Sequence, residues 1–142
     1  MVRLVCIDID GTLVGAHGVA ERVWPALARA RAKGIALALC SGRPGFGSTR
    51  QLADQVGPGG WHVFQNGASI LQLATGRSLS SPHAPGTVRA LIAIARRTGR
   101  VLELYTDIDY AVESRGSRAR RHAELLGLPF APRPFEIGRA HV

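Results

Sequence analysis

Alternating apolar and polar blocks in the first half of the chain predict strands and helices in turn. Short apolar runs at 3–9, 35–40 and 61–65 have the pattern of buried strands. Between them, 21–34 and 48–56 are expected to be helices, the first with apolar residues at helical spacing. A strand–helix–strand–helix–strand order favours a right-handed parallel α/β sheet, which is a Rossmann-like architecture.

Individual residues indicate where these two helices begin and end. Pro25 fits only the first turn of the first helix, and Gly34 is a natural stop after its last turn. We expect Ser48 to cap the N-terminus of the second helix, because its hydroxyl can accept a hydrogen bond from a free backbone N–H.

A change of pattern after Asn66 predicts a second region. The expected elements are a hairpin over 68–73 and 77–80, a linker over 80–86, helices over 87–99 and 117–127, and an antiparallel hairpin over 101–106 and 110–114. We therefore expect residues 1–80 to form one domain, and residues 81–135 to form the start of a second, α/β domain.

The composition fits a globular protein. The chain is 46% hydrophobic and 20% charged, so disorder is not expected. No apolar run approaches the roughly 20 residues that a membrane-spanning helix needs, and no signal-peptide cleavage site follows the N-terminus. The expectation is a cytoplasmic protein without a membrane partner.

The net charge of +8 raises the alternative of a nucleic-acid-binding module. Arginine supplies 17 of the 18 basic residues, and these are scattered over the chain rather than gathered in one stripe. The densest group, at 114–122, is expected to be a solvated helix face. We therefore do not expect a nucleic-acid partner, and the sequence indicates no oligomeric state.

Polar residues follow all three predicted parallel strands. In an open α/β sheet, ligands bind outside the carboxyl ends of the strands, so we expect these residues to line one crevice. They are Asp8 and Asp10 after the first strand, Ser41, Gly42 and Arg43 after the second, and Asn66 and Gly67 after the third.

These residue types suit phosphoryl chemistry. Of two carboxylates spaced i, i+2, one can act as a nucleophile or metal ligand while the other handles protons. The hydroxyl of Ser41 and the backbone N–H of Gly42 suit a phosphoryl oxygen. Because carboxylates alone repel phosphate, a divalent cation is implied, and Mg²⁺ prefers oxygen ligands.

The same stretches resemble motifs of the haloacid dehalogenase superfamily. The first motif is similar to DIDGTL at 8–13, and the second, which ends in a phosphate-binding serine, is similar to LALCSGRP at 37–44. The third stretch, FQNGASI at 64–70, resembles the Cof-type (type IIB-like) branch with a larger α/β cap. The order and strand context agree from about residue 2 to residue 135.

The resemblance implies a Mg²⁺-dependent phosphatase that acts on a small phosphorylated metabolite through an aspartyl-phosphate. A phosphomannomutase-like phosphotransferase of the same superfamily and a non-catalytic phosphate- or nucleic-acid-binding module are the alternatives. By resemblance, the second region would be part of a cap that closes over the crevice. The residues would act as follows: Asp8 as nucleophile and metal ligand, Asp10 as general acid/base and metal ligand, Ser41 and Gly42 on the phosphoryl group, and Arg43, Asn66 and Gly67 beside the substrate.

Two motifs that the superfamily needs are missing. One is a lysine after the second motif, but the only lysine here is Lys33, upstream of it. The other is an acidic pair following a glycine, and no Gly-Asp dipeptide occurs. Residues 136–142 resemble an in-frame translation of a common sequencing adapter and are expected to be a non-native tail. We therefore expect a truncated, inactive and poorly folded chain whose incomplete sheet exposes an apolar edge.

Overall fold

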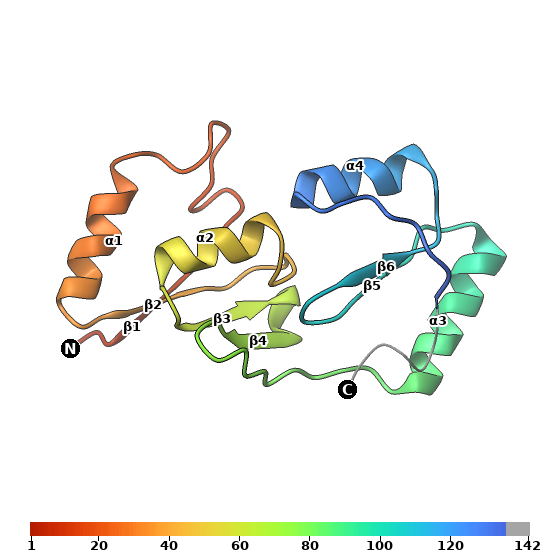
Figure 1. The fold of residues 1–142 in the computed structure, drawn as a ribbon, viewed down its shortest axis with the longest axis horizontal. Coiled ribbons are helices and arrows are strands. Elements are labelled where there is room, and N and C mark those ends of the chain that lie inside the picture. The colour runs from red at the N-terminus through yellow and green to blue at the C-terminus, as the bar shows by residue number, and fades with distance from the viewer. Residues whose placement is uncertain (136–142) are drawn as a thin grey trace.

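The computed structural model describes residues 1–135 (Figure 1), so the predicted tail at 136–142 lies outside the described residues. The elements are β1 (Leu4–Ile7), α1 (Val23–Ala32), β2 (Ala36–Leu39), α2 (Ser48–Val56), β3 (Trp61–Phe64), a 3₁₀ turn (Gln65–Gly67), β4 (Ser69–Gln72), α3 (Pro85–Thr98), β5 (Glu103–Tyr105), β6 (Tyr110–Val112) and α4 (Ser117–Leu126). This order confirms the predicted α/β architecture.

The three strands predicted to be parallel lie next to one another, but they are not equally well paired. β1 and β2 pair in parallel over their whole length, with Leu4 opposite Ala36. β3 joins β2 through a single parallel bridge between Cys40 and Val63. The reason lies in a side chain, because the Leu39 N–H donates a hydrogen bond to the ring of His62.

The predicted hairpin at 68–73 and 77–80 is only partly formed. β4 takes β3 as its main partner, antiparallel, with Trp61 opposite Gln72. The later segment contributes one bridge, between Leu71 and Ser78, and the Leu79 N–H donates to the Ile70 carbonyl at 2.9 Å. The first group of elements therefore ends in an antiparallel edge rather than in a separate hairpin.

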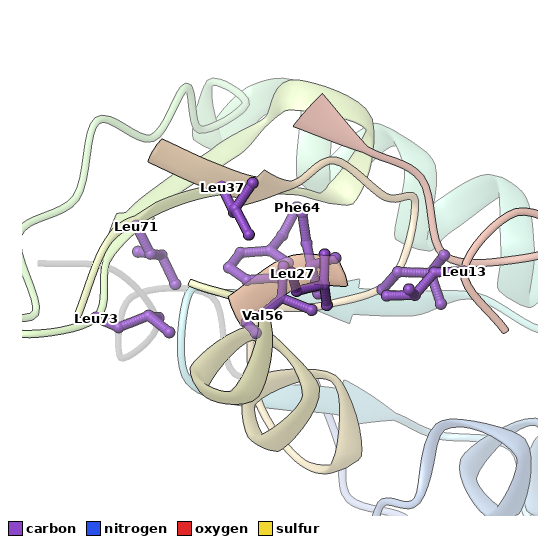
Figure 2. Close-up of a cluster of buried hydrophobic side chains, with 10 residues drawn as sticks. Leu13, Leu27, Leu37, Val56, Phe64, Leu71 and Leu73 are labelled. Carbon is purple, nitrogen blue, oxygen red and sulfur yellow. The ribbon is translucent and has the colours of Figure 1, made fainter. Parts of the chain in front are cut away.

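A hydrophobic cluster joins β2, β3 and β4 to the two helices of this group (Figure 2). Leu27 from α1 and Val56 from α2 pack with Phe64 from β3, which is fully buried. This apolar core is what holds the carboxyl ends of the strands, and the polar residues that follow them, in fixed positions.

β1 is more exposed than a buried strand should be. The side chains of Leu4 and Val5 are 55% and 36% exposed. Within residues 1–135, β2 is the strand that pairs with β1, so one edge of β1 has no neighbour. The prediction of a fully buried first strand is therefore wrong, whereas the predicted exposed apolar edge is confirmed.

The helix ends agree with the sequence signals in two of three cases. Pro25 lies in the first turn of α1, and Gly34, with φ +74°, follows its end. Ser48 is not an N-cap: it is the first residue of α2, after Gly47, and its hydroxyl donates to the Leu126 carbonyl at 2.8 Å. A distant backbone acceptor thus takes the hydroxyl that was expected to cap the helix.

The elements from α3 to α4, which we call the second unit (residues 85–126), lie beside the first group in Figure 1. α4 contributes Ala123 and Leu126 to a small apolar cluster, and Phe46, from the loop between β2 and α2, packs against it. A residue from the first 80 thus completes a cluster of the second unit.

Within the described part of the chain, every helix is too short or too polar to cross a membrane.

Candidate functional site

The turn after β1 presents two exposed carboxylates. Gly11, with φ +78°, reverses the chain, and its N–H donates to the Val14 carbonyl at 3.1 Å. This left-handed conformation favours glycine, which explains the residue after Asp10. The Thr12 hydroxyl donates to Asp8 Oδ2 at 3.2 Å, so the Asp8 carboxylate is oriented but stays accessible at the end of the strand.

Asp10 is held by Arg43 from the turn after β2. Arg43 Nε donates to one carboxylate oxygen at 2.9 Å and Nη2 to the other at 2.5 Å. These hydrogen bonds, together with the positive charge of the guanidinium, lower the pKa of Asp10 and outweigh the opposing effect of burial. The structure therefore brings the first two predicted strand ends together, through an ion pair that was not predicted.

Ser41 lies nearly buried, at 7% exposure, between the ends of β2 and β3. Its N–H donates to the Val63 carbonyl at 3.0 Å, and its carbonyl accepts the Asn66 N–H at 3.1 Å. The Arg43 N–H donates to the Ser41 hydroxyl at 3.2 Å. We call residues 41–43 the serine turn, and its backbone is fixed from both sides.

Gly42 and Asn66 meet at this point. A Cβ atom added to Gly42 would lie 3.0 Å from Asn66 Oδ1, so a larger residue would push the Asn66 side chain away. Asn66 has φ +56°, a left-handed conformation that asparagine tolerates better than most residues. The third predicted strand end, Asn66 and Gly67, therefore lies beside the serine turn, as the crevice prediction requires.

Two residues that support the site were not singled out from the sequence. Gln65 also has a positive φ, +52°, and its N–H donates to the Arg43 carbonyl at 3.0 Å. His62, fully buried, accepts the Leu39 N–H at Nδ1 and pairs through Nε2 with the Gly57 carbonyl, both at 3.0 Å. A histidine inside an apolar run was the only sequence signal for the latter.

The other candidate groups near the site carry no chemistry of their own. Cys40 precedes Ser41, but burial and the neighbouring Cys6 thiol raise its pKa to about 11, so it stays protonated. Among residues 1–135, no three acidic, histidine or cysteine side chains are arranged to hold a metal ion. A metal bound here would need ligands beyond the side chains of this part of the chain.

Sequence comparison gives a family for this geometry. Residues 5–126 match the family described as haloacid dehalogenase-like hydrolase. Over 84 residues the chain is 37% identical to the protein named "Putative phosphatase YxeH" of Bacillus subtilis (strain 168), covering 56% of this chain and 31% of that protein.

Solved structures share the fold. A haloacid dehalogenase-like hydrolase from Bacteroides thetaiotaomicron superposes with a TM-score of 0.82 at 24% identity, over 94% of this chain and 52% of that one. BT4131, described as a HAD subclass IIB sugar phosphatase, gives 0.75 at 22% identity, over 92% and 51%. The chain thus spans about half the length of these proteins. Since the family match covers most of its residues, the chain belongs to the haloacid dehalogenase-like hydrolase family.

Proposed function

We propose that the complete protein is a Mg²⁺-dependent phosphatase that hydrolyses a small phosphorylated metabolite through an aspartyl-phosphate. The observation that carries the proposal is the arrangement at the strand ends: an accessible Asp8 next to the Asp10–Arg43 pair and the serine turn, in a chain of this family. The named activity of BT4131 makes sugar phosphates the first substrate class to test.

Asp8 is the nucleophile in this proposal. A carboxylate oxygen of Asp8 attacks phosphorus, and the bond from phosphorus to the ester oxygen breaks as the aspartyl-phosphate forms. The leaving oxygen takes a proton from Asp10. Water then attacks the phosphorus of the intermediate, with Asp10 accepting the proton, and Asp8 is released together with inorganic phosphate.

Arg43 sets a condition on this cycle. While Nε and Nη2 of Arg43 donate to the Asp10 carboxylate, the lowered pKa keeps that carboxyl ionised, and it has no proton to give. A guanidinium also binds phosphoryl oxygens in the same two-pronged way. We infer that an incoming phosphoryl group competes for Arg43, which frees Asp10 and lets its pKa rise toward the range of a proton donor. Ser41 and Gly42 would hold the phosphoryl group meanwhile.

The donor set for Mg²⁺ is incomplete but of the right kind. The Asp8 carboxylate and the Asp10 main-chain carbonyl would hold the ion, since both are oxygen ligands. No cluster of three acidic ligands exists within the described residues, so phosphate oxygens and water would fill the remaining positions. Bound there, the ion would neutralise charge on the phosphoryl group. Because the lysine and the second acidic pair are absent, we expect no measurable turnover from the 142-residue chain alone.

The test is phosphate-ester hydrolysis by the complete protein encoded at the source locus. Asp8→Asn should lower turnover of p-nitrophenyl phosphate by about a thousandfold or more, because the nucleophile is lost. Asp54→Asn is the matched control, since Asp54 is an exposed residue of α2 that pairs with Arg50 at 3.7 Å. Unchanged turnover in Asp8→Asn would refute the assigned nucleophile. A requirement for a sugar bisphosphate activator would reassign the protein as a mutase.

A further inference from the structure

Gln65 connects the serine turn to the second unit. Its backbone N–H donates to the Arg43 carbonyl at 3.0 Å. Its side-chain Nε2 donates to the Thr106 carbonyl at 2.7 Å, in the turn between β5 and β6. One residue therefore touches both a predicted phosphoryl-binding element and the tip of a hairpin that is more than 40 residues away in sequence.

The backbone at Gln65 is in an unfavourable conformation. Its φ of +52° lies in the left-handed region, which residues other than glycine, asparagine and aspartate seldom adopt. Asn66, which follows, is left-handed too, and its N–H donates to the Ser41 carbonyl. Residues in this region persist only where surrounding contacts hold them. At Gln65, the contact with Thr106 is one of those holding it.

The hairpin tip is docked on the first group independently of Gln65. Asp107, next to Thr106, accepts hydrogen bonds from the hydroxyls of Ser69, at 2.5 Å, and Ser80, at 2.6 and 2.7 Å. Ser78 donates to the same carboxylate at 2.5 Å. Hydrogen bonds to a charged acceptor are the stronger kind. These bonds hold the Thr106 carbonyl in a fixed position relative to the first group. The hydrogen bond from Gln65 to this carbonyl therefore fixes the Gln65 side chain as well.

The far side of the loop that begins with the serine turn is also tied to the second unit. The Phe46 ring lies 6.4 Å from that of Tyr105 and packs against the α4 cluster. Ser48, two residues on, donates to the Leu126 carbonyl. The segment between β2 and α2 is therefore linked to the second unit at both of its ends. Near the serine turn the link runs through Gln65, which bonds to Arg43 and to Thr106. At the other end Phe46 and Ser48 contact the second unit directly.

We propose that Gln65 is a positioning residue: its side-chain hydrogen bond couples docking of the β5–β6 hairpin to the shape of the serine turn, so that phosphoryl oxygens are held well only when the hairpin is docked. This inference rests on the proposed function for its meaning, since the turn is assigned to phosphate there. The mechanical coupling itself can be measured without any ligand.

Hydrogen exchange of the 142-residue chain tests the coupling. Gln65→Met keeps the length and shape of the side chain but removes the donor. The amides of Asn66 and Thr106, which bond to the Ser41 and Asp109 carbonyls, should exchange about fivefold faster, the effect of one lost hydrogen bond. Gln72→Met is the control, because within residues 1–135 the Gln72 side chain bonds locally, accepting from the Thr75 hydroxyl at 2.8 Å.

The outcomes separate cleanly. If the Asn66 amide in Gln65→Met exchanges at the wild-type rate, Gln65 does not position the turn and the proposal fails. If all protected amides accelerate equally, including those between β1 and β2, Gln65 is merely structural and the proposal fails as well. As a second perturbation of the same coupling, Asp107→Asn should loosen the hairpin and accelerate exchange at Asn66; acceleration confined to the hairpin would overturn it.

Binding of inorganic phosphate, followed by ³¹P NMR in the presence of Mg²⁺, keeps the two proposals apart. Gln65→Met should weaken phosphate binding about fivefold, in step with its effect on exchange. Ser41→Ala should weaken it whatever Gln65 does. If wild type and Ser41→Ala do not differ, the phosphate assignment of the turn is wrong, and the exchange result still decides whether Gln65 couples the hairpin to it.

Discussion

Replacing His62 with leucine tests how the carboxyl end of β2 is held in place. The His62 ring is fully buried and pairs with two backbone groups, the Leu39 N–H and the Gly57 carbonyl. Leucine would leave the Leu39 N–H without a partner, whereas the Gly57 carbonyl would keep its hydrogen bond from the Gly60 N–H at 3.0 Å. One buried unpaired group costs about 1–3 kcal/mol, so the free energy of unfolding should fall by about that amount. That is a measurable fraction of the roughly 5–15 kcal/mol typical of a whole domain.

Urea unfolding followed by tryptophan fluorescence measures this loss. His17→Leu is the matched control, because His17 is exposed in the turn before α1 and its replacement should leave stability nearly unchanged. A loss below about 1 kcal/mol in His62→Leu, the value of a single ordinary hydrogen bond, would refute the argument. It would mean that β2 and β3 are held together by their backbones and not by the ring.

Protonation of the His62 ring should make the stability of the fold depend on pH. Burial lowers the pKa of His62, an effect larger than the opposing hydrogen bond to Gly57. In the unfolded chain the imidazole takes up a proton near its ordinary pKa of about 6.5, whereas in the folded chain it is protonated only at a lower pH. Stability from this group is therefore complete above about pH 6.5 and falls as the pH decreases through the window below it. Urea midpoints compared at about pH 7.5 and about pH 5 should differ less in His62→Leu than in wild type.

Two further substitutions test close packing and the contact between the units. A Cβ atom at Gly57 would lie 2.1 Å from the Leu37 carbonyl oxygen, so Gly57→Ala should lose about 1–3 kcal/mol in urea unfolding. Gly86→Ala, in the open first turn of α3, should not, and equal losses would contradict the packing argument. Ser48→Ala removes the bond to the Leu126 carbonyl and should cost about 0.5–1.5 kcal/mol; unchanged stability would show that this contact adds nothing.

The order of elements was predictable because its signals are local. Apolar spacing and punctuating residues such as Pro25 and Gly34 act within a few positions of where they stand. The convergence of Asp10, Ser41 and Asn66 followed from the same order, since the carboxyl ends of neighbouring parallel strands meet at one edge.

The contacts that the sequence did not predict join residues distant along the chain. Arg43 was expected at the end of the second strand, but its pairing with Asp10, 33 positions away, has no local signal in the sequence. Ser48 looked like a cap because the competing acceptor, Leu126, lies 78 positions away. The exposure of β1 likewise depends on which strands lie beside it, and the residues of a strand do not determine its neighbours.

The place of Phe46 has a consequence for exchanging modules between relatives. Phe46 lies within the first 80 residues of the chain, but its ring packs against the apolar cluster of α4 and against Tyr105. Grafting the second unit of a relative onto these strands would therefore require an aromatic at 46 that matches the new cluster. Cutting at the linker would leave one partner with a hole and the other with an exposed ring. A substitution at position 46 therefore has to fit the residues of the α4 cluster, whatever the sequence of the linker.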